Sequence, residues 1–327
     1  MKSLTRNVVV ILLTLAFAPQ AKSGQPPQKV RIGYSTMSAT TAPLWVAQDE
    51  GFFARNGIDT ELIFIPGPPI VVASLNRGDV TLAMVGGSTV LAGAAGGIDL
   101  KIIAAILNRV PHDFVVRPEV QRPQDLRGKR VGVTALGGTA WMAAMFALEK
   151  LGLNAEKDHI TVSSLGDQRL VSQALESGTI DAGLLTGTFS LRLKRLGFRF
   201  FGDIDRIQLL SGGIVVKEGT LRSETNLVKG LLNGLVAAHA FVLDPKNKPK
   251  LLTTIMRRLG TNDKTVAEDG LDDLIRRTDW KLHASAEGLK NIQRFVQLRN
   301  PKLASINVAD LIDDTLLLRS MYQGGND

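Results

Sequence analysis

The chain has 327 residues, of which 44% are hydrophobic and 21% charged, so it has room for about two folded domains and is not composed like a disordered protein. It contains no cysteine, which excludes disulfides, thiolate nucleophiles and cysteine-ligated metal sites. The formal net charge is +8, or +5 without the basic residues Lys2, Arg6 and Lys22 near the N-terminus, and this modest positive balance mildly favours anionic ligands. No basic cluster is interleaved with aromatic residues, so nucleic acid is not an expected partner.

The first 23 residues predict a secretory signal peptide. Basic residues precede an apolar run over 8–18, and the small residues Ala21 and Ser23 suit a cleavage site. This run is too short to cross a bilayer, and no other stretch approaches the length of a membrane span. Because a lipid-anchored exported protein needs a cysteine at its new N-terminus, we expect a periplasmic protein that begins near Gly24 and carries no lipid anchor.

Strand and helix patterns alternate through the first part of the mature chain. Thr41 and Pro43 mark the entry of the first helix, and Pro66-Gly67-Pro68-Pro69 and Gly86-Gly87-Ser88 form turns. This alternation predicts a mostly parallel sheet covered by helices on both faces. The predicted strands are 29–33, 61–65, 80–85 and 100–107, and the predicted helices are 43–53, 70–75 and 89–95.

The same order of elements returns about a hundred residues later. RIGY at 31–34 is echoed by RVGV at 130–133, and LNRGDVTLAMVGGS at 75–88 is echoed by LESGTIDAGLLTGT at 175–188. Two similar α/β lobes imply a cleft between them, where small molecules bind. The second lobe has predicted strands at 130–134, 160–164 and 180–185, and predicted helices at 140–151, at 168–175 and from Gly187 through Arg195.

Two similar apolar segments predict how the lobes are joined. They are FVVR at 114–117 and IVVK at 214–217, and extended strands at both places would cross between the lobes as a two-strand hinge. The second lobe, 114–217, is then inserted into a discontinuous first lobe made of 24–113 and 218–327.

The C-terminal part is predicted to be helical and to pack on the first lobe. Basic residues at 256–258 and 275–277 are expected to form solvated faces of these amphipathic helices. The predicted helices are 228–242, 250–259, 289–298 and 308–321.

Four turns rich in glycine and hydroxyl side chains come just before predicted helices. The first turn of a helix has unpaired N–H groups and a partial positive charge, so such turns attract anions. In a doubly wound sheet all four lie at the carboxyl ends of strands, where ligands bind. The alternative is that Thr41, Ser88 and Thr139 only cap their own helices and that Asp167 is no more than an N-cap. The turns are Ser38–Thr41, Gly86–Thr89, Leu136–Thr139 and Gly187-Thr188.

The remaining candidate residues also have structural alternatives. Trp45 and Trp141 are expected to pack in the core. Arg109 and His112 follow a strand near the hinge, where they either reach an anionic ligand or serve a structural role. Catalysis has little support, because the four histidines lack metal-ligand spacing and the nucleophile-elbow and dinucleotide motifs do not occur. We therefore expect no enzyme, no cofactor and no metal.

The run APLWVAQDEGFFARNGIDTEL at 42–62 resembles the opening of substrate-binding proteins of ABC importers for nitrate, sulfonates, taurine and thiamin precursors. The resemblance continues through the segments at 75–88 and 175–183 and through DLRGKRVGV at 125–133. It implies a type II periplasmic binding protein fold, in which two doubly wound α/β lobes close over a ligand by hinge bending. It also implies docking of the closed form on permease subunits in the inner membrane.

The resemblance also places a ligand site on both lobes. At Thr186–Phe189 this chain departs from the many relatives that carry a tryptophan and a proline there, which alters the predicted pocket. Arg109 is a further candidate. Matched by motif, the site residues are Ser38, Thr40, Gly67, Gly87 and Ser88 in the first lobe and Gly138, Thr139, Gly187 and Thr188 in the second.

The predicted function is that of a monomeric, non-catalytic receptor. It would capture a small anionic solute, such as a sulfonate, taurine, nitrate or a carboxylate, and deliver it to an ABC importer. Two alternatives stay open. Some relatives are enzymes that make a thiamin pyrimidine, although they rely on a cysteine-rich segment that this chain lacks. A ligand-sensing partner of a membrane histidine kinase would carry the same sequence features.

Overall fold

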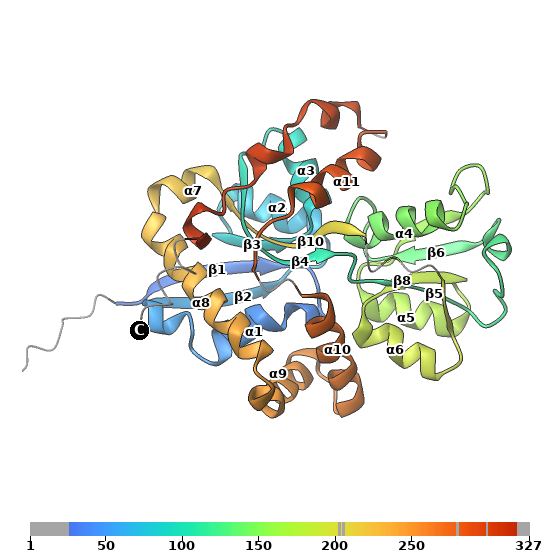
Figure 1. Cartoon of the computed structure of the whole chain (residues 1–327), viewed down its shortest axis with the longest axis horizontal. Helices are drawn as coiled ribbons and strands as arrows, with labels where there is room; N and C mark the ends of the chain where they lie inside the picture. The colour runs from blue at the N-terminus through green and yellow to red at the C-terminus, as the bar shows by residue number, and fades with distance from the viewer. Residues whose placement is uncertain (1–25, 202–203, 205–206, 279–280, 299, 319–327) are drawn as a thin grey trace, which may run out of the picture.

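A computed structural model describes residues 26–318, except 202–203, 205–206, 279–280 and 299. The predicted signal peptide therefore lies outside the described residues. The chain forms two α/β lobes, each built on a five-stranded sheet (Figure 1).

The first sheet has the strand order β2-β1-β3-β10-β4. Strand β1 pairs in parallel with β2 and β3, whereas β10 runs antiparallel between β3 and β4. The sheet is thus mostly parallel, as predicted, with one reversed strand. The strands are β1 (Gln28–Tyr34), β2 (Ile58–Phe64), β3 (Leu82–Val85), β4 (Leu100–Arg109) and β10 (Gln208–Lys217).

The second sheet repeats this arrangement with the order β7-β6-β8-β5-β9. Strand β6 pairs in parallel with β7 and β8, and β5 is the reversed strand, between β8 and β9. The internal repeat predicted from the sequence is therefore present as a repeated sheet topology. The strands are β5 (Asp113–Val116), β6 (Arg130–Val133), β7 (Thr161–Ser164), β8 (Ala182–Leu185) and β9 (Arg199–Phe201).

The two segments predicted to be hinge strands lie inside the sheets instead. In β5, Val115 pairs with Gly183 of β8, and in β10, Ile214 pairs with Met84 of β3. A short apolar β-branched run is typical of any buried strand, so its sequence did not distinguish a sheet strand from a crossing segment. The chain crosses between Arg109 and Asp113 and again between Phe201 and Gln208. Residues 208–217 therefore belong to the first sheet, and the prediction that places them in the second lobe is wrong.

Helices pack on both sheets, and α10 and α11 lie where the two lobes meet (Figure 1). In the first lobe they are α1 (Ala42–Asp49), α2 (Pro68–Arg77), α3 (Gly87–Ala95), α7 (Glu218–Ser223), α8 (Thr225–Leu243), α9 (Lys248–Leu259), α10 (Lys264–Arg277) and α11 (Ala286–Val296). In the second lobe they are α4 (Thr139–Lys150), α5 (Gln168–Ser177) and α6 (Gly187–Arg195). Short 3-10 helices are η1 (Ala39–Thr41), η2 (Ala54–Asn56), η3 (Pro123–Leu126), η4 (Pro245–Asn247), η5 (Pro301–Ser305) and η6 (Val308–Leu311).

The long helix predicted over 308–321 is wrong within the described residues. The 3-10 turn η6 ends at Leu311, and Ile312 then forms a parallel bridge with Ile102 at the edge of β4. Asp313 continues this contact, because its N–H donates to the carbonyl of Ile102. Helical backbone resumes only at 315–318. Pairing with the sheet edge has overridden the helical periodicity of the sequence.

Helix α8 corrects the expectation that no segment beyond the signal has the length of a membrane span. Its 19 residues are long and apolar enough to cross a membrane, but half of the helix is buried inside the protein. A side chain at Gly234 would place its Cβ 2.6 Å from the Phe53 ring, so this helix is pressed closely against the first lobe. Helix α8 is a core helix in this fold. Trp45 and Trp141 are also buried, as predicted.

Two C-terminal helices of the first lobe touch the second lobe. Helix α10 packs against α6, and α11 approaches α4 (Figure 1). Between α11 and α4, the ring centroids of Phe295 and Phe146 lie 4.3 Å apart. The sequence suggested that the basic residues at 275–277 face solvent. Arg277 is instead 5% exposed, because α10 lies between the lobes. The lobes are thus in contact through both of these helices.

Candidate functional site

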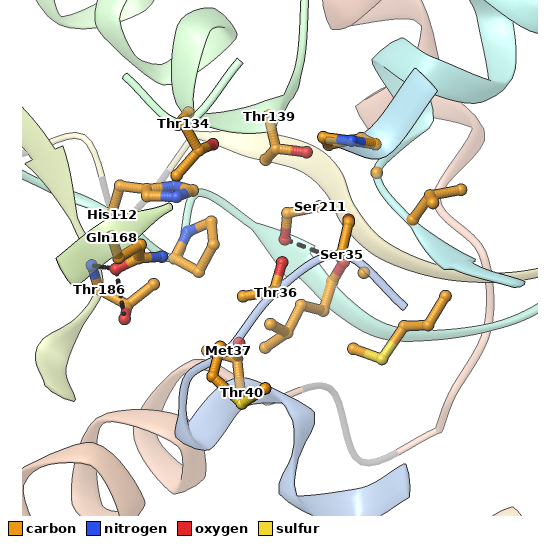
Figure 2. A pocket seen from close by; sticks show the side chains of 18 of the residues that line it. Ser35, Thr36, Met37, Thr40, His112, Thr134, Thr139, Gln168, Thr186 and Ser211 are labelled. Carbon is orange, nitrogen blue, oxygen red and sulfur yellow. Dashed lines mark hydrogen bonds between the residues drawn. The ribbon is translucent and has the colours of Figure 1, made fainter. Parts of the chain in front are cut away.

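The carboxyl ends of strands from both sheets meet at one polar pocket between the lobes (Figure 2). The first lobe contributes the segment after β1, the turn after β3 and part of β10, and the second contributes the segments after β6, before α5 and after β8. The pocket volume is about 50 Å³, well below the roughly 300 Å³ at which organic ligand sites begin. An organic solute would therefore enter only if the lobes separate. The polar residues that line the pocket are Ser35, Thr36, Thr40, His112, Thr134, Thr139, Asp167, Gln168, Thr186 and Ser211.

Two of the predicted site residues line this pocket, one from each lobe: Thr40 and Thr139. Ser38 lies directly behind Thr40, with the two hydroxyl oxygens 2.7 Å apart. The hydroxyl of Thr139 lies against the backbone of Gly86, where an added Cβ would be 1.8 Å from Thr139 Oγ1. The two lobes thus touch at Gly86 and Thr139.

Four other predicted residues do not line the pocket but lie within two residues of one that does. Gly67, Gly87 and Gly138 are each one residue away from a lining residue. A Cβ on Gly87 would meet Leu289 of α11, so this glycine allows helix packing. Ser88 is 2% exposed, and its hydroxyl has no hydrogen-bond partner among the described residues.

The last three predicted residues are engaged elsewhere. The N–H of Gly187 donates to Asp273 Oδ2 at 3.2 Å. Thr188 Oγ1 accepts from the N–H of Ala39 at 3.2 Å, a contact between the lobes. Arg109 is exposed at the end of β4 and does not line the pocket. Ligand contact by any of the ten residues stays a prediction.

The capping alternatives have mixed outcomes. Asp167 caps α5, because its carboxylate accepts from the N–H groups of Arg169 at 2.7 Å and Leu170 at 3.1 Å. Thr41 does not cap α1 and instead donates its hydroxyl hydrogen to the carbonyl of Thr36. No side-chain cap is present at the start of α3 or α4.

Sequence reasoning missed the buried pair of Gln168 and Thr186. Gln168 Oε1 accepts from both the N–H of Thr186 at 2.9 Å and its hydroxyl at 3.0 Å. Both residues are buried and line the pocket beside His112 (Figure 2). Two features of the sequence could have identified them as site residues. Gln168 directly follows Asp167, the N-cap of α5, and Thr186 begins the segment that departs from the motif of the relatives.

His112 lies in the crossing segment before β5 and is 6% exposed. Its Nδ1 has no hydrogen-bond partner among the described residues. Burial, with a smaller contribution from the positive charge of Arg277, lowers the pKa of His112 to about 3. The imidazole is therefore neutral at physiological pH, with one nitrogen that donates and one that accepts.

A buried ion network, made of Asp113, Asp273 and Arg277, lies behind the pocket. Arg277 Nε is 2.7 Å from Asp273 Oδ1, and Arg277 Nη2 is 2.8 Å from Asp113 Oδ1. Arg277 Nη1 also donates to the carbonyl of Val110. Burial raises the pKa of Asp113, against the opposing effects of Arg277 and of a hydrogen bond from Ser190. The network ties α10 to the crossing segment.

The chain matches known proteins in both sequence and structure. Residues 38–248 match the model of a family described as NMT1/THI5 like. YtlA of Bacillus subtilis, which is named as a binding protein, is 30% identical over 52% of this chain and 51% of its own length. The 4-amino-5-hydroxymethyl-2-methylpyrimidine phosphate synthase of Uromyces fabae is 30% identical over 43% of this chain and 41% of its own length. The chain spans about half the length of the first curated relatives that it matches.

Solved structures match over nearly the whole chain. The alkanesulfonate-binding protein SsuA from Xanthomonas axonopodis pv. citri, bound to MOPS, superimposes with a TM-score of 0.73 at 19% identity over 88% of this chain and 99% of that one. The periplasmic nitrate-binding protein NrtA from Synechocystis PCC 6803 gives a TM-score of 0.75 at 13% identity over 91% and 89%. At these identities the likeness establishes the fold alone.

Proposed function

The chain belongs to the NMT1/THI5-like family and has the predicted periplasmic binding protein fold, and from this premise we propose that it is a periplasmic solute receptor of an ABC importer. It captures a small molecule between its lobes and presents the closed form to the permease in the inner membrane. The observation that carries the proposal is the pocket itself, where the strand ends of two repeated sheets bring polar groups of both lobes together.

Opposed contacts explain how capture and closure are coupled. Thr40 and Thr139 come from different lobes and line the same pocket. A solute that bonds to both stabilises the closed arrangement over any open one, because only the closed form offers both sets of contacts. A closed receptor bound to solute differs in shape from an open one, which gives a permease something to recognise.

The chemistry of the lining supports binding over catalysis. Within the described residues, the pocket offers hydroxyl groups, the amide of Gln168, a neutral imidazole and a carboxylate already bonded to the start of α5. A nucleophilic enzyme needs a hydroxyl activated by a neighbouring base. His112 Nδ1 has no such hydroxyl partner in the described part of the chain. The similarity to a pyrimidine phosphate synthase keeps an enzymatic function as the rival to be tested.

The proposal is tested by a thermal-shift screen of residues 24–327 against sulfonates, nitrate, carboxylates, amides and pyrimidines. A solute at a hundred times its Kd adds about 2.7 kcal/mol to the free energy of unfolding. That gain raises the melting temperature by several degrees in a protein of this size. A shift without chemical change of the compound supports a receptor, whereas its conversion, followed by mass spectrometry, would identify an enzyme.

A further inference from the structure

A second and larger pocket between the lobes is lined by Arg169 and Arg192. The pocket at the strand ends, in contrast, has no positively charged side chain among the described residues that line it. Within the described residues, neither lysine nor arginine lines it, and its one carboxylate belongs to Asp167. Asp167 is also 3.5 Å from the exposed guanidinium of Arg169, which screens part of its charge at the rim. An anion entering this pocket would lose its hydration without gaining a cationic partner, which is unfavourable.

Helix N-termini could replace cations, but two of those near the pocket already hold carboxylates of the chain itself. Asp167 accepts from two N–H groups at the start of α5. Asp273 accepts from Gly187 at the start of α6, and a Cβ on Gly187 would lie 2.4 Å from the Cβ of Asp273. The sequence pointed to the turn at Gly187 as an anion-binding element. Asp273 of the chain occupies that place.

The buried guanidinium of the ion network is also engaged. The side chain of Arg277 is 4% exposed and bonds to two carboxylates, those of Asp113 and Asp273, and to a backbone carbonyl. Its positive charge is therefore balanced inside the buried ion network. It does not compensate a negative charge in the pocket.

What the pocket does offer is a set of neutral hydrogen-bonding groups. His112 is more than nine-tenths buried, lines the pocket and has an Nδ1 without a partner among the described residues. Gln168 accepts twice through Oε1, which leaves its amide hydrogens as donors. Thr134 and Thr139 add hydroxyl groups from the second lobe (Figure 2). Such groups pair with a solute that both donates and accepts.

We infer that the solute is an uncharged polar molecule, recognised through hydrogen bonds to His112, Gln168 and Thr139, and not the anion that the sequence favoured. This inference rests on the proposed receptor function and narrows its substrate class. An unpartnered buried imidazole nitrogen costs stability in the unliganded protein, and a solute that bonds to it recovers that loss.

Matched pairs of probes test the inference: nicotinamide with nicotinate, uracil with orotate, and acetamide with acetate. Methanesulfonate, taurine and nitrate are added as further charged probes. We expect a neutral member to raise the melting temperature of residues 24–327 and to bind at least tenfold more tightly than its anionic partner by calorimetry. Stronger binding of the anionic members would overturn the inference and leave the receptor function standing. If no probe raises the melting temperature, this result contradicts both the receptor function and the inference that rests on it.

Variants then locate the responding probe in the pocket. His112→Ala should weaken its binding about tenfold, and His112→Gln, which keeps hydrogen-bonding groups, should weaken it less. His159→Ala is the matched control, because His159 is exposed and lies outside the pocket. Equal affinities of the His112→Ala and His159→Ala proteins, both shown to be folded by circular dichroism, would remove His112 from the site.

Discussion

Arg277 and Asp113 form a buried ion pair between the lobes, with Nη2 and Oδ1 2.8 Å apart. Arg277 ends α10, a helix of the first lobe, and Asp113 begins β5, a strand of the second sheet. Charges of this kind are costly to bury and tolerated only when paired. The pair therefore fixes how α10 sits against the crossing segment, and with it the position of His112 next to Asp113.

Replacing Arg277 with methionine should destabilise the protein by about 3 to 5 kcal/mol, because Asp113 loses its cationic partner and Asp273 loses its buried one. Urea unfolding measures this loss. Arg276→Met is the control, since Arg276 also contacts Asp273 but its side chain is 60% exposed, and its loss should cost less than about 1 kcal/mol. Similar losses in the two variants would contradict a special role for the buried pair.

Thr139→Val should weaken binding of the stabilising solute about tenfold while leaving the free energy of unfolding within about 0.5 kcal/mol. Valine keeps the shape of threonine but removes the hydroxyl group that lines the pocket. Calorimetry and urea unfolding give the two quantities. Thr161→Val changes an exposed threonine in the same lobe and should alter neither. Unchanged affinity in Thr139→Val would place the site elsewhere.

Acid should destabilise the protein through His112. Its folded pKa of about 3 lies below the ordinary value of 6.5, so between these values the unfolded chain holds a proton that the folded protein lacks. Stability from the neutral imidazole is complete above pH 6.5 and is lost as the pH falls toward 3, by at most about 1.4 kcal/mol per pH unit.

Unfolding free energies at pH 7 and pH 5 measure this effect, and the comparison of the wild type with a His112 variant separates it from the effects of other titrating groups. The His112→Gln protein should show a smaller difference between the two pH values than the wild type. Asp113 acts in the opposite direction, since its raised pKa lets the folded protein gain a proton first. Identical pH dependence in both proteins would mean that His112 is not neutralised by folding.

The contact between the lobes at Thr139 requires a glycine at position 86. A side chain there would collide with Thr139 Oγ1 from the opposite lobe and approach the carbonyl of Ser211 at 3.2 Å. Gly86→Val should hold the lobes apart, so that saturating solute no longer reduces the radius of gyration measured by small-angle scattering. Gly219→Ala is the control, because a Cβ there meets nothing within 4 Å. Normal compaction of Gly86→Val would argue against closure at this contact.

Much of the fold could be predicted from the repeated sequence. The echo between 75–88 and 175–188 corresponds to helix–strand–helix units in both lobes, α2-β3-α3 and α5-β8-α6. Local patterns determine such units, so their positions were found to within a few residues. The reversed strands β5 and β10 were recognised as extended, but their places in the sheets depend on long-range pairing that periodicity does not report.

The candidate site was predicted less completely, for a physical reason. Helix N-termini were identified correctly as elements of the sheet edge, but their partners were not visible in the sequence. Gly187 bonds to Asp273, which is 86 residues away. Arg277 was expected to be solvated because it sits in a basic run, yet tertiary packing buries it. His112 was named as a candidate, and only the fold shows that its Nδ1 has no partner among the described residues.

Strand β10 has a consequence for the order in which the chain folds. It lies between β3 and β4, in the interior of the first sheet, although it is made only after the whole second sheet. All five strands of the second sheet come from residues 113–201, whereas the strand partner of β4 in the described sheet, β10, comes only at residues 208–217. During synthesis, β4 therefore stays unpaired until the second sheet has been made, and a fragment ending before residue 208 would contain every strand of the second sheet but lack β10 of the first.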